Sequence, residues 1–273
     1  KGQVYQVLGT TSGNSGVDLT GTRVQSVASG SGGCKRIAVF SGSGKLSIST
    51  PGCNAGSADN LYQQLYPVAA WGRKYVTAPS VNKPWNYYRI QRSSPTANVF
   101  LNGALIPAGS FTNNYYQFFN NTPNIIEADT AISVAQYFTS QNCPAGLGGN
   151  ASPYDPDMII LNPVEQNINR VTLVNSPLTI TGAQQHNIHA VIRTGGTAQS
   201  SFTLDGTPIP VTNWMTHPAD PNYAYLYMSN VAQGNHTIYS DSGFNAIAYG
   251  YGNVETYGYS AGTNVKDIYQ YMS

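Results

Sequence analysis

Two nine-residue stretches of the chain carry nearly the same pattern. Val99–Pro107 reads VFLNGALIP, and Phe202–Pro210 reads FTLDGTPIP, beginning 103 residues later. In each stretch an Asn-Gly or Asp-Gly pair is flanked by apolar and β-branched residues, which is the strongest short-range signal for a two-residue β-hairpin of type I′. The sequence therefore predicts one tight hairpin at the Asn-Gly pair 102–103 and another at the Asp-Gly pair 205–206.

The likeness extends beyond the hairpins in both directions. Two upstream segments share the pattern Leu-x-Pro-Val, two strand-like runs precede the hairpins, and two alternating runs follow them. The matched segments are Leu65–Pro79 with Leu161–Asn175, Asn86–Arg92 with Asn187–Arg193, and Asp129–Tyr137 with Ser242–Gly250. The pattern predicts a duplicated unit that spans roughly 61–141 and 157–260 of the 273 residues.

The composition favours strands. Only 9% of the residues are charged, whereas Gly (28), Pro (16) and Tyr (20) are abundant; soluble domains usually have about 25% charged residues. Apolar stretches are rich in Val, Ile, Tyr and Phe, which are typical of strands. We predict an all-β protein of two tandem β-sandwich-like units related by an internal repeat, with an N-terminal strand segment that completes the first. The expected divisions are 1–56, 57–145, 146–262 and a C-terminal tail at 263–273.

Charge and hydropathy argue against two classes of partner. The 13 basic and 12 acidic residues are dispersed and give a net charge of +1, so there is no basic stripe for nucleic acid. No apolar run approaches the roughly 18 residues that a membrane-spanning helix needs. The opening KGQVYQVLG lacks the features of a signal peptide, and we expect a mature form or an excised fragment of a longer protein.

The chain has three cysteines. Cys34 and Cys53 flank two strand-like runs around a Ser-Gly-Ser-Gly turn, so we predict a local disulfide between them. Closing a loop of that size would contribute roughly 3 kcal/mol to stability. Cys143 has no evident partner, and we expect its partner in sequence outside this chain.

The carboxylates and histidines give one candidate metal site and no catalytic signature. Asp155 and Asp157 form the densest acidic pair, and oxygen-rich loops bind Ca²⁺, so a structural calcium ion is the one cofactor considered. The alternative is that Asp155 makes a turn and Asp157 opens a strand. His186 and His189 are three apart, which on a strand places them on opposite faces, and this opposes a shared metal. A Gly-x-Ser-x-Gly elbow is absent from the sequence.

Aromatic residues form the candidate ligand-binding group. Trp85, Tyr87 and Tyr88 lie in PWNYYRI, and exposed aromatic side chains stack on sugars or anchor protein interfaces. Strand alternation predicts that at least one of the two tyrosines faces solvent. The alternative is that these rings fill the core of a sandwich.

Several ordered motifs carry a family resemblance. They are LTGTxV, IAVFSG, DNLYQQLYPVAAWGRKYV, ISVAQY and DPDMIILNPVEQ, and the likeness runs from about Leu19 to Gly262. The chain resembles the IgGFc-binding protein N-terminal domain family. That resemblance implies a non-enzymatic adhesion or interaction module of a larger extracellular or cell-surface protein, with a protein or glycan ligand. Animal members are rich in cysteine, so this chain resembles a bacterial adhesin-type member.

Two other functions stay open at this point. A carbohydrate-binding module attached to a catalytic domain would use the same aromatic residues. A hydrolase on a β scaffold would need a pocket with two converging carboxylates.

Overall fold

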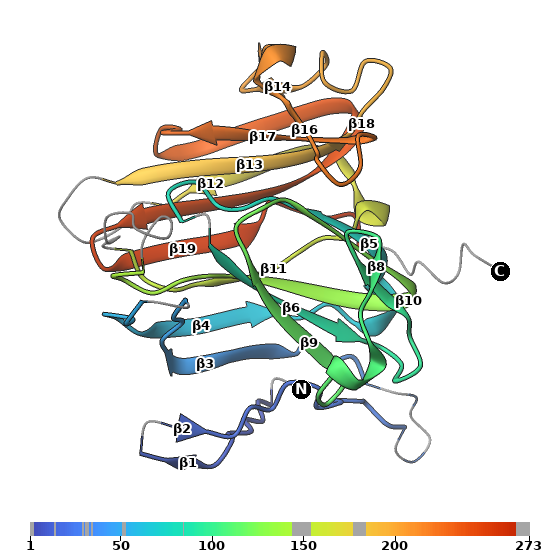
Figure 1. Cartoon of the computed structure of the whole chain (residues 1–273), viewed down its shortest axis with the longest axis vertical. Helices are drawn as coiled ribbons and strands as arrows, with labels where there is room; N and C mark the ends of the chain where they lie inside the picture. The colour runs from blue at the N-terminus through green and yellow to red at the C-terminus, as the bar shows by residue number, and fades with distance from the viewer. Residues whose placement is uncertain are drawn as a thin grey trace.

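The computed structural model describes residues 3–13, 15–28, 30, 33, 35–50, 53–83, 85–143, 154–176 and 184–265. In these ranges the regular elements are strands, apart from four short 3₁₀ helices. Two large curled sheets lie one above the other, with smaller strand pairs at the N-terminal end (Figure 1). The predicted all-β fold class is confirmed. Nowhere in the described part of the chain does a helix have the length and apolarity that crossing a bilayer requires.

The two large sheets contain strands in the same order. The first comprises β5 (Gly72–Thr77), β6 (Asn86–Arg92), β7 (Val99–Leu101), β8 (Ala104–Leu105), β9 (Tyr115–Asn120), β10 (Asn124–Phe138) and β11 (Met158–Ile160). The second comprises β12 (Ile168–Asn175), β13 (Gln185–Arg193), β14 (Thr203–Leu204), β15 (Thr207–Pro208), β16 (Met215–Thr216), β17 (Tyr223–Ser229), β18 (Gly234–Gly252) and β19 (Glu255–Ser260). Their orders are β8-β7-β10-β6-β9 and β15-β14-β18-β13-β17-β16. This correspondence is what a duplicated unit predicts.

One long strand bends each sheet into a sandwich. The first part of β10 pairs with β5 and β7, and its second part pairs with β6 and β11. In β18 the first part pairs with β12 and β14, and the second with β13 and β19. Gly243 has φ +76° between the two parts of β18, a conformation that glycine adopts readily. The bend turns the two parts of each sheet toward one another.

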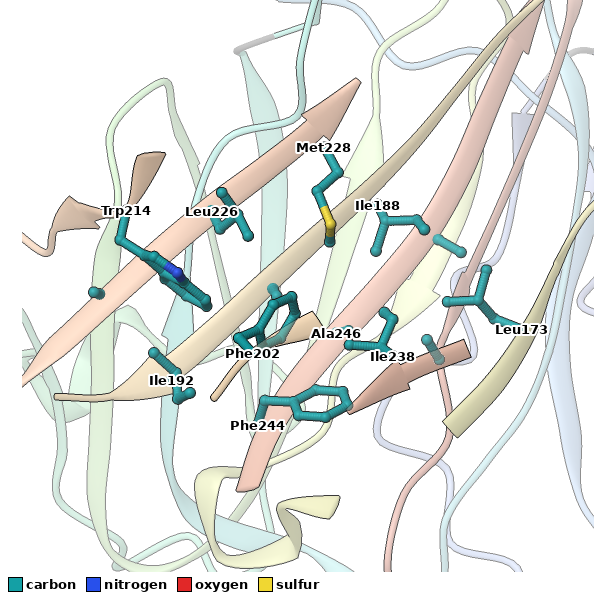
Figure 2. Close-up of a cluster of buried hydrophobic side chains, with 14 of the residues drawn as sticks. Leu173, Ile188, Ile192, Phe202, Trp214, Leu226, Met228, Ile238, Phe244 and Ala246 are labelled. Atoms are coloured by element: carbon teal, nitrogen blue, oxygen red, sulfur yellow. The ribbon is translucent and has the colours of Figure 1, made fainter. Parts of the chain in front are cut away.

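The core of the second unit fills the space inside its bent sheet. Figure 2 shows Phe202, Trp214 and Phe244 meeting there, with aliphatic side chains of β13 and β17 around them. The ring centroid of Phe202 lies 5.1 Å from that of Trp214 and 5.5 Å from that of Phe244, and both ring pairs are edge-to-face. Such pairs stabilise a core beyond simple burial.

Both predicted hairpins are confirmed. Asn102 and Gly103 have φ +51° and +81°, and Asp205 and Gly206 have φ +53° and +78°, as a type I′ turn requires. The first turn residue also bonds to the long strand of its unit. Asn102 Oδ1 accepts from the backbone N–H of Ile125, and Asp205 Oδ1 from that of Thr237, each at 2.8 Å. The repeated Asn or Asp therefore has a tertiary role as well as a local one.

The Gly206 turn gives a stability prediction. A Cβ added at Gly206 meets no atom within 4 Å, so Gly206→Ala adds only the strain of a left-handed backbone, about 1 kcal/mol. We expect the free energy of unfolding in urea to fall by that amount. The matched control is Gly109→Ala, where a Cβ also has open space and φ is not positive. Equal effects at the two sites would contradict the assignment of strain to the turn.

The N-terminal region forms two small strand pairs. β1 (Thr11–Ser12) pairs with β2 (Ser15–Gly16), and β3 (Phe40–Leu46) pairs with β4 (Asp59–Gln64). Leu61 of β4 and Ile48, just beyond β3, pack against Ala135, Met158 and Ile160 of the first unit. The division predicted between residues 145 and 146 lies outside the described residues, as do residues 266–273 of the predicted tail.

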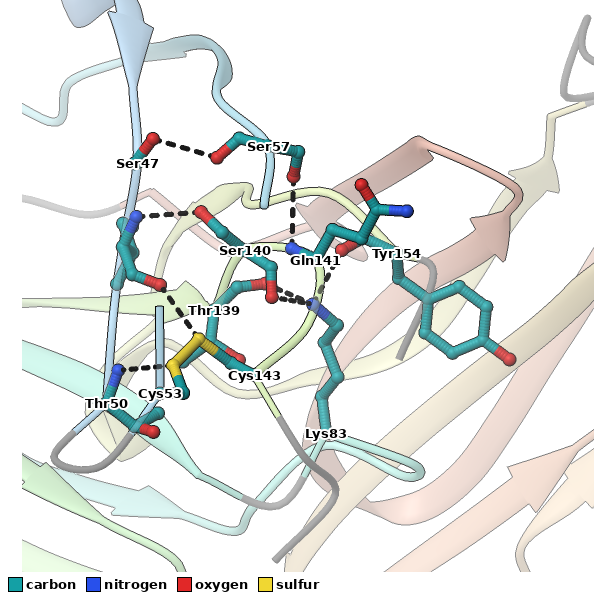
Figure 3. Close-up of a disulfide and its surroundings, with 11 residues drawn as sticks. Ser47, Thr50, Cys53, Ser57, Lys83, Thr139, Ser140, Gln141, Cys143 and Tyr154 are labelled. Atoms are coloured by element: carbon teal, nitrogen blue, oxygen red, sulfur yellow. Dashed lines mark hydrogen bonds between the residues drawn. A yellow bond between two sulfur atoms is a disulfide. The ribbon is translucent and has the colours of Figure 1, made fainter. Parts of the chain in front are cut away.

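The disulfide differs from the prediction. Cys53 is bonded to Cys143, 90 residues away (Figure 3), so the predicted pairing of Cys53 with Cys34 is wrong. Cys34 itself lies outside the described residues. The reason is the pairing of the N-terminal strands. β3 pairs with β4, and Cys53 lies in the connection between these two strands. This connection runs beside the segment that follows β10, which contains Cys143.

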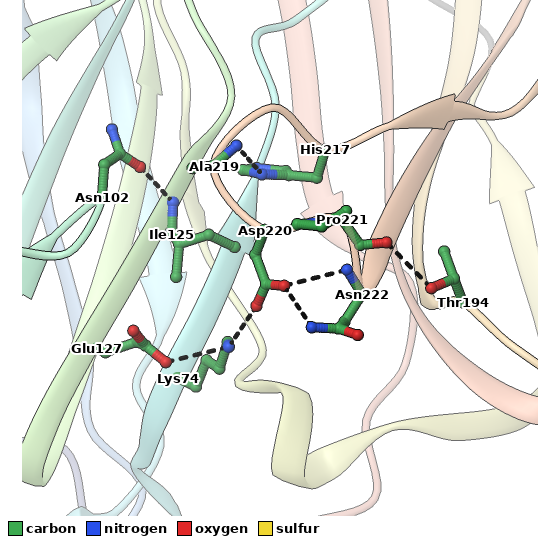
Figure 4. Close-up of polar contacts among 10 residues, drawn as sticks. All are labelled: Lys74, Asn102, Ile125, Glu127, Thr194, His217, Ala219, Asp220, Pro221 and Asn222. Carbon is green, nitrogen blue, oxygen red and sulfur yellow. Dashed lines mark hydrogen bonds and ion pairs between the residues drawn. The ribbon is translucent and has the colours of Figure 1, made fainter.

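The two units share an interface. Tyr249 and Tyr251 of β18 pack into the core of the first unit, where the Tyr249 ring centroid lies 5.3 Å from that of Phe138. At the rim, Lys74 Nζ lies 2.9 Å from Asp220 Oδ2 and 3.0 Å from Glu127 Oε1 (Figure 4). The two units are therefore joined by buried aromatic contacts and by ion pairs at the edge of the interface.

Candidate binding site

Alternation along β6 separates the aromatic residues that the sequence singled out. Tyr87 is half-buried on the outer face of the sheet, and Trp85, just before the strand, is half-buried as well. Tyr88 points inward, is 0% exposed and stacks on Phe118 at 5.1 Å. Tyr88 is therefore a core residue, and its predicted role in ligand binding is corrected. Tyr87 lies on the opposite face from Tyr88, but it packs partly buried against the cluster that contains Ile48 and Leu61. Exposure of one of the two tyrosines to solvent therefore stays a prediction.

A neighbouring strand completes a cluster of three rings. Phe119 of β9 is the register partner of Tyr87. Its ring centroid lies 4.8 Å from that of Trp85, nearly parallel, and 5.0 Å from that of Tyr87. We call Trp85, Tyr87 and Phe119 the aromatic cluster. Sequence reasoning missed Phe119; the alternation in YYQFFN marks it as an outward residue, but only the strand register places it opposite Tyr87.

The N-terminal segment covers the other end of the same face. Arg89, two residues beyond Tyr87, lies 3.0 Å from the carboxylate of Asp18 and donates to Thr20 Oγ1 at 2.6 Å. Its guanidinium also lies over the ring of Tyr115, 4.6 Å from the centroid. Arg89 is therefore engaged in contacts within the protein, whereas Trp85 and Phe119 stay half-exposed.

A shallow, open groove of about 470 Å³ is lined in part by residues that precede Trp85 in the sequence. The connection after β5, the connection between β9 and β10, and strand β17 form it, so both units contribute. It is lined by Pro79, Ser80, Val81, Asn82, Asn121, Pro123, Tyr225 and Tyr227. The hydroxyl of Tyr227 donates to the carbonyl oxygen of Pro79 at 2.6 Å, which ties the two units together at the groove.

The chemistry of the groove is mixed. Amide side chains of Asn82 and Asn121 offer donors and acceptors, while prolines and tyrosine rings offer apolar area. Asn82 Nδ2 already donates to Gln185 Oε1 at 2.6 Å, which fixes that amide. A few positioned polar groups among apolar walls are typical of sites for small or extended ligands.

In the acidic pair Asp155 is buried and Asp157 is half-buried. Burial raises the pKa of Asp155, opposed by a hydrogen bond from Ser57 and by the nearby charge of Lys83. Burial raises the pKa of Asp157 to about 7, opposed by backbone N–H groups of Met158 and Gly258. No group of three or more His, Cys, Asp or Glu side chains that could hold a metal occurs in the described ranges. Calcium at Asp155 and Asp157 stays a prediction.

The two histidines of β13 lie in different surroundings. His186 Nδ1 is 3.0 Å from the Tyr257 hydroxyl. His189 packs beside Tyr225 and Tyr227 between the units, and burial lowers its pKa to about 3. At neutral pH His189 therefore packs as an uncharged ring within the fold.

Comparison with known proteins identifies the family. A family model described as IgGFc binding protein matches residues 1–250, which include the aromatic cluster and the groove. No curated protein matches the chain, and no solved structure does. The Cys53–Cys143 disulfide is typical of an oxidising compartment. Since the match spans most of the sequence, the chain belongs to the IgGFc binding protein family, a family of extracellular binding modules that are not known as enzymes.

Proposed function

We propose that this chain is a non-enzymatic adhesion module of a larger cell-surface or secreted protein, and that it binds a protein ligand through the aromatic cluster and the groove. The observation that carries the proposal is the half-exposed stack of Trp85 and Phe119, with Tyr87 tilted against it. Large aromatic side chains at the centre of an interface supply most of its binding free energy.

The support behind the cluster suits this role. Phe119 and Tyr87 sit on paired strands, and the ring beneath them, Tyr88, is locked in the core. A ligand would therefore lose little free energy to ordering of the site. The groove would add amide groups of Asn82 and Asn121 to the contact with a ligand that reaches both places. A module that recurs in a parent protein gains further through multivalency.

Replacing Trp85 tests the proposal. We expect Trp85→Ala to weaken binding by at least about 30-fold, which is 2 kcal/mol. The first ligand to measure is the Fc fragment of IgG, because the family description names it, with affinity measured by surface plasmon resonance. The matched control is Tyr239→Ala, an exposed tyrosine of the second unit, which should leave affinity unchanged. Equal affinities for the wild type and the Trp85 variant would contradict the role of the cluster.

A carbohydrate-binding module is the second candidate. It is favoured by the combination of a stacked indole ring with Asn82 and Asn121 amides in the groove, since sugar rings stack on aromatics while their hydroxyls bond to amides. Retention on immobilised polysaccharides, lost in Trp85→Ala, would favour this function. Binding to the Fc fragment with no retention on any glycan would favour protein adhesion.

A further inference from the structure

The N-terminal hairpin has the geometry of an unfinished unit. In the first unit β10 and β11 pair with Ala135 opposite Ile160, and in the second β18 and β19 pair with Ile247 opposite Ser260. In the hairpin, Phe40 lies opposite Gln64. Four residues after Gln64 and after Ile160 a 3₁₀ helix begins, η1 (Val68–Ala70) and η3 (Val164–Gln166). β3 therefore corresponds to the second part of β10 and of β18.

Side-chain contacts between the repeats support this correspondence. Tyr66 and Asn162 follow β4 and β11 at the same distance, and the Tyr66 hydroxyl donates to Asn162 Oδ1 at 3.0 Å. Asn162 Nδ2 in turn donates to the carbonyl oxygen of Gly262, which follows β19 at that distance, at 2.7 Å. Equivalent positions of three successive repeats thus bond to one another in chain order.

One edge of β3 lacks the partner that its counterparts have. β10 pairs with β6 as well as β11, and β18 with β13 as well as β19. Within the described residues β3 pairs with β4 alone. The backbone N–H of Leu65 donates to Val39 O, and bonded pairs alternate along an antiparallel ladder. The backbone groups of Phe40 and Gly42 therefore point to the open edge.

The apolar surface beside this edge is exposed. Phe40 is 48% and Tyr62 62% exposed, and their rings stack at 5.2 Å. The corresponding residues of the two complete units, such as Ala135 and Ile247, are buried under neighbouring strands. An unpaired strand edge next to apolar side chains is a template for another strand.

We propose that the open edge of β3 takes up an antiparallel strand of the β6 or β13 kind, donated by another unit of this family. In each of the two complete units of this molecule, the equivalent strand edge is paired with such a strand. In the first unit Asn86–Arg89 of β6 lies opposite Ala135–Phe138, and in the second His186–His189 of β13 lies opposite Ile247–Gly250. The donated strand would pair with Phe40–Ser43 before the register shift that follows Ser43. The surface thus joins one module to the next.

The test uses the full chain and a synthetic peptide with the β13 sequence, QHNIHAVIRT (185–194). Amide hydrogen exchange is measured with the peptide, with a scrambled peptide and without either. At ten times the dissociation constant we expect the Phe40 and Gly42 amides to exchange about tenfold more slowly with the β13 peptide alone. No protection, or protection at residues elsewhere, would overturn the proposal.

Three variants separate strand pairing from apolar adhesion. Phe40→Pro removes the Phe40 ring and also an N–H at the open edge, where proline is tolerated, and should abolish peptide binding. Phe40→Ala removes the ring alone and should retain binding. Tyr62→Ser removes the stacked ring but leaves the edge intact, and should retain binding. If Phe40→Pro proves unfolded by circular dichroism, the exchange pattern of the wild type still decides. Protection of the Phe40 and Gly42 amides by self-association without peptide would overturn the proposal, because the edge would then pair with the β3 edge of a second copy and not with a strand of the β13 kind.

Discussion

Removal of the Cys53–Cys143 disulfide is expected to lower the free energy of unfolding by roughly 4 to 5 kcal/mol. The bond closes a loop with a sequence separation of 90 residues, and in the chain-entropy model the stabilisation grows with loop length. The loop includes all of β4 to β10. Without the bond, this part of the unfolded chain has more conformational entropy, which favours unfolding. The measurement is urea denaturation of the Cys53→Ser/Cys143→Ser double variant against the wild type.

The pairing itself is checked by peptide mapping without reduction. A cross-linked peptide containing Cys53 and Cys143 is expected. The control variant is Cys34→Ser, which leaves that bond in place and should lose none of this stability. A cross-link between Cys34 and Cys53, or equal losses in the two variants, would contradict the structure.

Lys83→Met is expected to lower the free energy of unfolding by about 3 kcal/mol. Lys83 is 1% exposed, and its ammonium group donates to the backbone carbonyl oxygens of Thr139, Ser140 and Tyr154 (Figure 3). The Met side chain has a similar length but no donor, so three buried acceptors would lose their partner. Burial lowers the pKa of Lys83 to about 7, although the Asp155 carboxylate opposes the shift. Because the folded-state pKa lies below the unfolded value of 10.5, this group adds stability as the pH rises above about 7, so the loss in Lys83→Met should be larger at pH 8 than at pH 6.

The matched control is Lys45→Met on β3. Lys45 is exposed, and a surface substitution away from any buried network usually changes stability by less than about 0.5 kcal/mol. Losses of similar size at Lys45 and Lys83 would show that the buried contacts carry no special stability. A large loss at Lys83 alone would identify it as the residue that ties the segment after β10 to Tyr154.

Local rules were enough to predict the strands and turns. The two hairpins follow from Asn-Gly and Asp-Gly because only a few residue types accept two successive positive φ values. The outward position of Tyr87 follows from the two-residue period of a strand. The all-β class and the family follow from composition and from motifs that recur in order. Each of these properties depends on residues that are neighbours in the chain.

The sequence by itself determined where the chain turns, that its elements are strands and which family it belongs to. Tertiary structure alone decided that Cys53 pairs with Cys143, that Phe119 completes the aromatic cluster, and that Lys83 is buried rather than solvated. The physical reason is that these outcomes depend on strand register and on which edges pair. Register joins residues many positions apart, and a shift of one position moves every side chain to the other face.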